Sequence, residues 1–350
     1  MKTGCRFPLV AAATLILAAC NVTPSAAPPS TSTPLPAIQP SATPTAVPLV
    51  LPTPSAIVAL EDRLLAAIQV PFPDEMVFVQ GFVWVKTDSG YLVQIDPATN
   101  TVVGETKLDT TTEKHDYCQG LGTDGTSIWA CSTRGDENLK TIDVVRVDPG
   151  TGSVVATVEV NKVHDQFDMP FLNNRIWVLA DGGSKLVGID TTTNQPGASI
   201  DLGTRCFGVD AATESLIVTC KLDDLILRVD PDSGEVIQRR TISSPLGVRV
   251  AADGVWIPVW KEVVRLDPES LEPVVAFGLS GDVDFFPTPE AIWARLDDGF
   301  LYRIDPIDNQ VEEQIVSDQR FYNMGDFLVT ADSIWTSAGD DDLVLRISLP

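Results

Sequence analysis

The chain has 350 residues, of which 24 are lysine or arginine and 48 are aspartate or glutamate. Among the bases only Lys2 and Arg6 precede Leu60, and every acidic residue follows it, so the remainder carries a formal charge of 22 minus 48, or −26. Such a surface repels polyanions, which argues against nucleic acid and anionic membrane surfaces as partners. It favours cations, cationic ligands or basic partners, or it serves only solubility.

The chain begins with the pattern of an export signal. Lys2 and Arg6 precede a short apolar run, residues 7–19, that ends in small residues and is too short to span a membrane. Residues 17–20, Leu-Ala-Ala-Cys, resemble the lipobox of bacterial lipoproteins. The resemblance implies that residues 1–19 are a signal peptide and that Cys20 becomes a lipid-carrying N-terminus. We therefore expect an exported protein, anchored by lipid to the bacterial cell membrane and facing outside the cytoplasm. An ordinary secretory signal is the alternative.

Residues 20–55 have the composition of a stalk. From Asn21 to Ser55 there are ten prolines, eleven serines or threonines, no glycine and no charged residue. A segment of this kind cannot bury a core and favours an extended chain. We predict a disordered stalk that holds the following domain away from the membrane.

About seven copies of one unit follow the stalk. Each unit has four short apolar-rich segments divided by turn residues, and its second segment carries a large apolar anchor. Successive anchors are 37 to 48 residues apart, a period typical of propeller blades. Residues 56–350 are therefore predicted to form one all-β domain, a seven-bladed β-propeller of four-stranded blades. We expect the anchors to pack between blades: Trp84, Trp129, Trp177, Ile217, Trp256, Trp293 and Trp335.

The third segment of six units ends in an aspartate that opens a turn, and proline follows it in five of them. An aspartate at this position accepts hydrogen bonds from backbone amides two residues on, and proline presets φ for the turn. These residues are therefore predicted to be structural: Asp96, Asp148, Asp190, Asp230, Asp267 and Asp305.

The seventh unit has no fourth segment of its own. An open sheet edge invites association, so a strand from elsewhere must complete the blade. We predict that Leu64–Val70 does so and closes the ring. Apolar residues also recur at helical spacing in this region, at Ile57, Leu60, Leu64 and Ile68, so a short helix that leads into the strand is compatible with this prediction.

Four cysteines remain after Cys5 and Cys20 are set aside, and three pairings are possible. A two-residue turn at Asp124-Gly125 would place Cys118 opposite Cys131. A three-residue loop at residues 212–214 would place Cys206 opposite Cys220. We therefore predict the disulfides Cys118–Cys131 and Cys206–Cys220. A metal site is the weaker alternative because no Cys-x-x-Cys spacing occurs.

One rim of the predicted ring collects acidic residues. The position nine residues before each anchor begins the innermost strand, next to the central channel. Four of these seven positions are acids, so we predict a ring of carboxylates at one mouth of the channel. Crowded carboxylates shift each other's pKa values and can bind a hard cation. The alternative is a set of solvated loop acids. The seven positions are Glu75, Gly120, Asp168, Gly208, Gly247, Asp284 and Asp326.

The four acids are candidate ligand-binding residues, and three of them, Asp168, Asp284 and Asp326, are candidate ligands of a divalent cation. Arg205 is the base expected beside the mouth, where it could counter an acid or hold a carboxylate. Trp260 lies beyond the anchor of its strand and could stack on a ligand. Apart from a divalent cation, no cofactor is predicted.

The repeated unit resembles that of seven-bladed propellers of the YVTN and streptogramin-lyase-like group. The resemblance covers the chain after the stalk and implies a propeller fold. It is carried by Gly247–Phe277, Ile226–Val236, Val144–Val155 and Leu301–Asp305.

That group includes ring-opening lyases of cyclic depsipeptides, which use a histidine and a glutamate with a divalent metal on one face. It also includes many extracytoplasmic propellers without assigned chemistry. The lyase pattern places its histidine late in the chain, whereas His115 and His164 lie early, so the lyase residues are not carried over. Each of these two histidines precedes an aspartate at a similar place in adjacent units, which makes them candidate general bases.

Two functional hypotheses result. The first is a membrane-anchored, non-enzymatic binding or interaction module outside the cytoplasm, with an acidic ligand face. The second is a metal-assisted lyase or hydrolase that uses the acidic mouth with His115 or His164. The ligand, whether protein, glycan or small molecule, is left open, and we expect a monomer.

Overall fold

The computed structural model describes residues 53–108, 118–134, 141–160, 163, 168–251, 254–260, 262–278, 283–296, 300–308, 310–317 and 326–350, without the side chains of 134, 141, 283, 284, 296 and 340. The predicted signal peptide, Cys20 and nearly all of the predicted stalk lie outside these ranges. Within them, no helix is long and apolar enough to cross a membrane.

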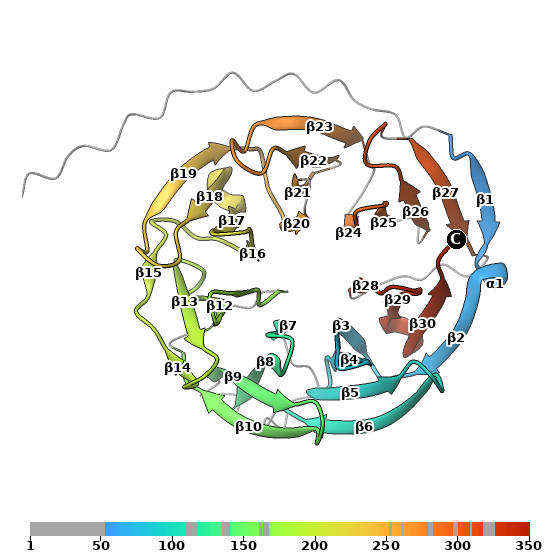
Figure 1. Cartoon of the computed structure of the whole chain (residues 1–350), viewed down its shortest axis with the longest axis horizontal. Helices are drawn as coiled ribbons and strands as arrows, with labels where there is room; N and C mark the ends of the chain where they lie inside the picture. The colour runs from blue at the N-terminus through green and yellow to red at the C-terminus, as the bar shows by residue number, and fades with distance from the viewer. Residues whose placement is uncertain are drawn as a thin grey trace, which may run out of the picture. The chain divides into compact units, whose positions relative to one another are not determined.

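Seven β-sheets are arranged in a ring, each with its first strand innermost (Figure 1). Blade 1 consists of β3 (Pro73–Val79), β4 (Phe82–Thr87), β5 (Tyr91–Asp96) and β6 (Thr101–Lys107). Blade 2 consists of β7 (Leu121–Thr123), β8 (Ile128–Arg134), β9 (Thr141–Asp148) and β10 (Ser153–Val158). Blade 3 consists of β11 (Phe171–Leu172), β12 (Arg175–Ala180), β13 (Lys185–Asp190), β14 (Gln195–Pro196) and β15 (Ile200–Asp201). Blade 4 consists of β16 (Gly208–Ala211), β17 (Leu216–Cys220), β18 (Leu225–Val229) and β19 (Val236–Thr241).

The remaining blades complete the ring. Blade 5 consists of β20 (Arg249–Ala251), β21 (Gly254–Val259), β22 (Glu262–Leu266) and β23 (Pro273–Gly278). Blade 6 consists of β24 (Val283–Pro287), β25 (Ile292–Leu296), β26 (Leu301–Ile304) and β27 (Val311–Val316). Blade 7 consists of β28 (Phe327–Val329), β29 (Ser333–Ala338), β30 (Leu343–Ser348) and β2 (Leu64–Gln69). The prediction of a seven-bladed propeller of four-stranded blades is confirmed.

Blade 3 departs from the regular pattern at its outer edge. Two short strands, β14 and β15, both pair with β13 where other blades have one continuous fourth strand. Pro196 ends β14, and because proline has no N–H to donate, it interrupts a strand ladder.

The anchor residues fill the junctions between blades, as predicted. Trp84 of blade 1 packs with Ile128 and Leu121 of blade 2, and Trp335 of blade 7 packs with Val83 of blade 1. All seven anchors are at most 2% exposed. Burying such side chains between every pair of neighbours is the main apolar contribution to the stability of the ring.

The turn aspartates are structural, as predicted. In blade 2, Asp148 Oδ1 accepts the N–H groups of Gly150 at 2.8 Å and Thr151 at 3.0 Å. The same bond, to the N–H two residues on, is made by Asp96, Asp190, Asp230, Asp267 and Asp305.

Arginines join five of these six turns to the preceding blade. The Arg265 guanidinium of blade 5 lies 5.4 Å from the Trp256 ring centroid and donates to the Pro306 carbonyl of blade 6 at 3.2 Å. Arg303 of blade 6 instead pairs with Glu312 of its own blade. Four other junctions have the same bond to a turn carbonyl, from Arg146 to Thr191, Arg175 to Pro231, Arg228 to Pro268 and Arg346 to Pro97.

The segment before the first blade closes the ring. β2 pairs antiparallel with β30 and completes blade 7, which confirms the predicted closure. A short helix, α1 (Leu60–Arg63), precedes it, as the helical spacing allowed. The structure adds a strand that was not predicted: β1 (Ala56–Ala59) pairs in parallel with β27 at the outer edge of blade 6. Arg63 also bonds Glu313 of β27 at 2.7 Å, so this segment contacts both blades 6 and 7.

Both predicted disulfides are present. The Cα atoms are 6.0 Å apart in Cys118–Cys131 and 3.8 Å apart in Cys206–Cys220. Each disulfide ties the segment before the innermost strand of its blade to the second strand. A loop of this size contributes about 3 kcal/mol in the chain-entropy model.

The hairpin registers predicted for these disulfides were wrong. Thr123 pairs with Ile128, and the β16–β17 hairpin is likewise joined by four residues, where loops of two and three were predicted. Asp124 accepts the N–H of Ser127 at 2.7 Å, which favours the longer loop. The cysteines still meet because the first cysteine of each pair precedes the first ladder residue of its hairpin, Leu121 or Gly208. The register of the ladder therefore does not fix the backbone of that cysteine.

Candidate binding site at the channel mouth

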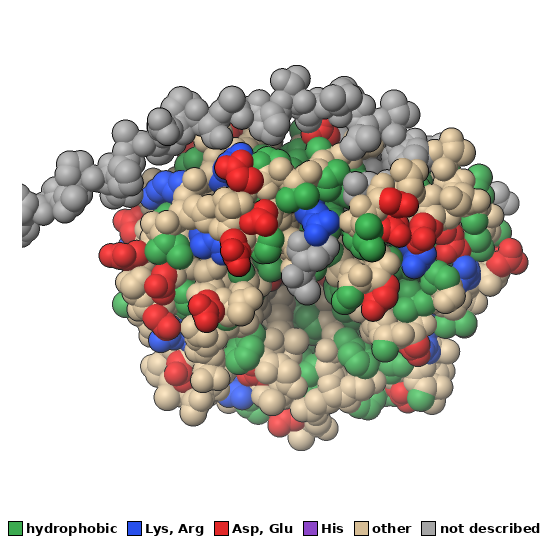
Figure 2. All heavy atoms as spheres, turned by 45° about the horizontal axis from the view of Figure 1, so that its top comes forward, with side chains coloured by type: hydrophobic (Ala, Val, Ile, Leu, Met, Phe, Trp, Pro, Cys, Tyr) green, Lys and Arg blue, Asp and Glu red, His purple; other side chains and the backbone are tan. Residues whose placement is uncertain are grey.

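The structure brings together three of the four predicted acids at the centre of the ring. Asp326 Oδ2 accepts the N–H of Met76 at 3.3 Å, directly beside Glu75. Asp168 forms a parallel bridge with Leu121 at the innermost strand of blade 2. The backbone of Asp284 lies in β24, but its side chain is outside the described residues. The face seen in Figure 2 is hollowed near the middle of the ring, with acidic side chains spread around it.

An arginine that the sequence analysis did not single out lies among these acids. Arg249, the first residue of β20 in blade 5, forms an ion pair with Asp168. Its second terminal nitrogen lies 3.5 Å from Asp326 Oδ1. One guanidinium thus links blades 5 and 7 to the segment that begins blade 3.

Asp210 of β16 is a second member that was not predicted. Its Oδ2 accepts the N–H of Val250, and its Oδ1 accepts the N–H of Ala211, both at 2.7 Å. Asp210 and Arg249 each lie two residues after the start positions Gly208 and Gly247. Since side chains alternate along a strand, residues two apart share a face, and this rule could have found both. We call Glu75, Asp168, Asp210 and Asp326, with Arg249, the acidic mouth.

The charges of the acidic mouth perturb one another. Burial raises the pKa of Glu75 well above its ordinary value, and Asp326, Asp74 and Asp168 raise it further, against the opposing effect of Arg249. Burial also raises the pKa of Asp210 to about 6, aided by Asp168 and opposed by Arg249 and two backbone hydrogen bonds. Burial alone would lower the pKa of Arg249, but the surrounding carboxylates outweigh it and raise that pKa.

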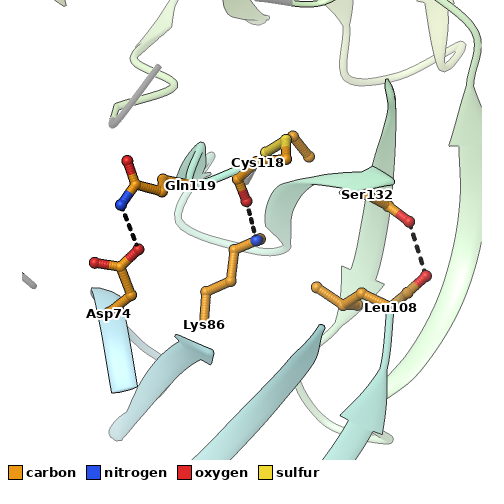
Figure 3. Close-up of a disulfide and its surroundings, with 7 residues drawn as sticks. Asp74, Lys86, Leu108, Cys118, Gln119 and Ser132 are labelled. Atoms are coloured by element: carbon orange, nitrogen blue, oxygen red, sulfur yellow. Dashed lines mark hydrogen bonds between the residues drawn. A yellow bond between two sulfur atoms is a disulfide. The ribbon is translucent and has the colours of Figure 1, made fainter. Parts of the chain in front are cut away.

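Hydrogen bonds from blades 1 and 2 hold one side of the mouth. Gln119 Nε2 donates to Asp74 Oδ2 at 2.8 Å, and the Asp326 N–H lies 3.4 Å from the Asp74 carbonyl oxygen. The buried Lys86 ammonium donates to the Cys118 carbonyl, next to the disulfide (Figure 3). Gln119 adjoins Cys118, so the Cys118–Cys131 disulfide fixes a chain segment that contacts the mouth.

Hydrogen bonds from blades 6 and 7 hold the opposite side. Arg295, only 3% exposed, donates to Thr336 Oγ1 at 2.9 Å and approaches the Asp326 carbonyl at 3.5 Å. That carbonyl also accepts the Ser337 hydroxyl at 2.9 Å. These bonds fix the backbone of Asp326 and leave its carboxylate directed at Arg249 and Met76.

The other predicted site residues lie apart from this cluster or outside the described ranges. The Arg205 guanidinium is 5.1 Å from the Phe207 ring centroid, beside blade 4. The Trp260 side chain is 68% exposed. His115 and His164 lie outside the described residues. Among the residues that the structure describes, no group of three or more histidine, cysteine or acidic side chains has the arrangement of a metal site.

The raised pKa of Asp210 predicts a pH dependence of stability. In the folded state Asp210 keeps its proton up to about pH 6. In the unfolded chain the same carboxyl has the ordinary pKa of 3.8 and loses its proton at lower pH. Stability from this group is therefore present below the ordinary pKa and is lost as pH rises through about 6. We expect the free energy of unfolding, measured by urea denaturation, to be about 1–2 kcal/mol higher at about pH 5 than at about pH 7.5.

Asp210→Asn should flatten that pH profile, since the amide does not titrate. Asp190→Asn is the matched control, because backbone hydrogen bonds lower the pKa of Asp190 and its contribution changes only under more acidic conditions. A wild-type profile that rises with pH between these values, or an Asp210→Asn profile as steep as that of the wild type, would contradict the assignment.

Comparison with known proteins gives no family: no family model matches the chain, and no curated protein matches it. Solved structures do match. The β-propeller domain of Myceliophteria thermophila Cps50 (Swd1) has a TM-score of 0.66 at 12% identity, with 82% of this chain and 99% of that chain covered. BamB from Moraxella catarrhalis has a TM-score of 0.56 at 13% identity, with coverages of 82% and 99%. The computationally designed Ika8 protein has a TM-score of 0.58 at 12% identity, with coverages of 82% and 100%. These likenesses establish one property of this chain, its β-propeller fold.

Proposed function

We propose that this protein is an extracytoplasmic binding module, anchored to the bacterial cell membrane through Cys20, whose acidic mouth binds a basic group of its ligand. The observation that carries the proposal is the pairing of Arg249 with Asp168 and Asp326 at the centre of the ring, with Asp210 bonded to the adjacent Val250 N–H. Among the described residues of the mouth, acidic groups outnumber the basic Arg249, so the mouth has an acidic character. An ammonium or guanidinium of a ligand is the complementary group.

The proposed location outside the cytoplasm rests on two features. The disulfides Cys118–Cys131 and Cys206–Cys220 suit an oxidising compartment outside the cytoplasm. The Leu-Ala-Ala-Cys sequence that ends at Cys20 supplies the lipid acceptor. BamB, another β-propeller of known structure, shares the fold at 13% identity. We also propose that the protein is a member of the YVTN and streptogramin-lyase-like group, which its repeats resemble.

A lyase or hydrolase activity has less support. His115 and His164, the candidate general bases, lie outside the described residues. The mouth acids that are described face Arg249, which occupies the place that a divalent cation would take between Asp168 and Asp326. The binding module is therefore the function that we put forward.

The test is heat-induced unfolding of the purified full-length protein with tetralysine, calcium or zinc. Tetralysine should raise the midpoint progressively as its concentration increases, because a ligand of the folded state stabilises it by RT ln(1 + [L]/Kd). Asp326→Asn should remove the shift. Glu214→Gln, at an exposed position in the β16–β17 loop, changes the charge equally and should keep it. A shift with the metals alone, or a tetralysine shift that survives Asp326→Asn, would refute the proposal.

A further inference from the structure

One segment, Ile242–Val250, joins the acidic mouth to the rim of blades 4 and 5. Its first seven residues connect β19 to β20, and its last two, Arg249 and Val250, belong to β20. At its end, Arg249 enters the mouth and pairs with Asp168, and the Val250 N–H donates to Asp210 at 2.7 Å. Whatever contacts the rim along this segment therefore lies close to the mouth.

At its start the segment is fixed beside an exposed leucine. The Ile242 N–H donates to the Asp224 carbonyl at 2.9 Å, and the Ser244 N–H donates to Asp224 Oδ1 at 2.7 Å. Asp224 directly follows the 3-10 turn Lys221–Asp223, in which Leu222 is 64% exposed.

In its middle the segment is fixed beside an exposed tryptophan. The Leu246 N–H donates to the Pro258 carbonyl at 2.8 Å, and Trp260 lies two residues further on. All seven tryptophans of the chain are described. Six are buried, at most 2% exposed, whereas Trp260 is 68% exposed. Trp260 therefore has no part in the packing between blades that the other tryptophans provide. We call Leu222 and Trp260 the rim patch.

We propose that the rim patch and the acidic mouth form one docking surface for an extended peptide segment of a partner protein. This inference rests on the proposed function of the mouth. Aromatic or aliphatic side chains of the peptide would lie on Trp260 and on Leu222, and a lysine or arginine would reach the mouth. Aromatic contact area beside complementary charge is the usual composition of such anchors.

Charge and distance select this occupant. A domain with a formal charge of −26 after Leu60 and four carboxylates at the mouth favours a basic partner. Leu246, bonded to Pro258 two residues before Trp260, precedes Arg249 by three residues, which is at most about 10 Å of extended chain. An extended peptide covers the same span in three residues, so its basic and apolar residues should lie two to four positions apart.

The experiment is a selection of phage-displayed random peptides on the full-length protein, followed by affinity measurement of the enriched peptides. We expect them to carry a lysine or arginine within four positions of an aromatic or aliphatic residue. Trp260→Ser and Leu222→Ser should each weaken binding by about tenfold. Both positions are exposed, so neither change should disturb folding. Ile307→Ser, at a 90% exposed position in the turn of blade 6, is the matched control and should leave affinity unchanged.

The outcomes separate this inference from the proposed function. Weaker binding with Asp326→Asn but unchanged binding with Trp260→Ser would overturn the rim patch and leave the mouth as the site. Weaker binding with Trp260→Ser but not with Asp326→Asn would overturn both proposals. Enriched peptides without basic residues, or no enrichment over the Trp260→Ser protein, would also overturn the inference.

Discussion

Replacing Arg249 by methionine should lower the free energy of unfolding by about 1–3 kcal/mol at about pH 7.5. The Arg249 side chain is 25% exposed, so the cost should lie between those of an exposed and a buried ion pair. Arg249 is the counter-charge that Asp168, Asp326 and Asp210 share. Methionine matches its aliphatic stem and removes only the guanidinium. The carboxylates would then repel one another at the centre of the ring.

The pH dependence of this variant gives the sharper test. Burial and neighbouring acids already raise the pKa values of Glu75 and Asp210, and Arg249 lowers both. Without Arg249 these pKa values rise further, so the variant should regain part of its lost stability at about pH 5, where Asp210 is protonated in the folded state. Urea denaturation at both pH values measures the effect.

Arg239→Met is the control for Arg249→Met. Arg239 is exposed on β19, and its removal changes the net charge by the same amount. It should shift stability by no more than about 0.5 kcal/mol at either pH. If Arg249→Met resembled this control, or lost equal stability at both pH values, Arg249 would not be the charge that holds the mouth together.

The fold could be predicted because its signals are local and repeated. An anchor such as Trp129 and a turn aspartate such as Asp148 recur with a period close to forty, and each acts within its own blade or on the next. The closing strand β2 could be predicted because the seventh unit lacks a fourth segment of its own. β1 could not be predicted in this way, because its parallel partner β27 lies more than 250 residues later and Ala56–Ala59 is a short stretch in which Ile57 also fits the helical spacing.

The site could be predicted only in part. Alignment of strand starts found Glu75, Asp168 and Asp326, because these acids occupy one position of the repeat. Arg249 and Asp210 lie two residues further along their strands and were missed. The contact of Arg249 with Asp168 spans 81 residues and crosses between blades, so local sequence could not show that an arginine compensates the ring of acids.

The second large effect should come from shortening the segment that closes the ring. Three forms can be compared. The form that begins at Thr53 keeps β1, α1 and β2. The form that begins at Leu64 keeps only β2, and the form that begins at Val70 lacks all three elements. Loss of β1 and α1 removes Leu60, which is 5% exposed in the complete domain, from the core and should cost about 2–4 kcal/mol. Loss of β2 as well leaves the outer edge of β30 unpaired and removes Ile68 from the core, which should cost much of the about 5–15 kcal/mol that stabilises a domain.

The junction of blades 6 and 7 is where this segment matters most. Five other junctions have an arginine bonded to a turn carbonyl of the next blade, but Arg303 of blade 6 pairs within its own blade. The contact between Arg63 and Glu313 lies at this junction, with Glu313 side-chain exposure of 7%. Arg63→Ala should therefore destabilise more than Arg240→Ala, whose partner Glu272 has a side-chain exposure of 58%.

Thermal unfolding, size-exclusion chromatography and hydrogen exchange can rank the three forms. The form beginning at Leu64 should stay monomeric, with faster amide exchange confined to β27 and its neighbours. The form beginning at Val70 should associate or fail to fold, since an unpaired β30 edge is a template for another chain. If it were instead a monomer as stable as the form beginning at Thr53, the seventh blade would hold without its fourth strand. Closure would then depend on the packing of Trp335 against blade 1 rather than on backbone pairing.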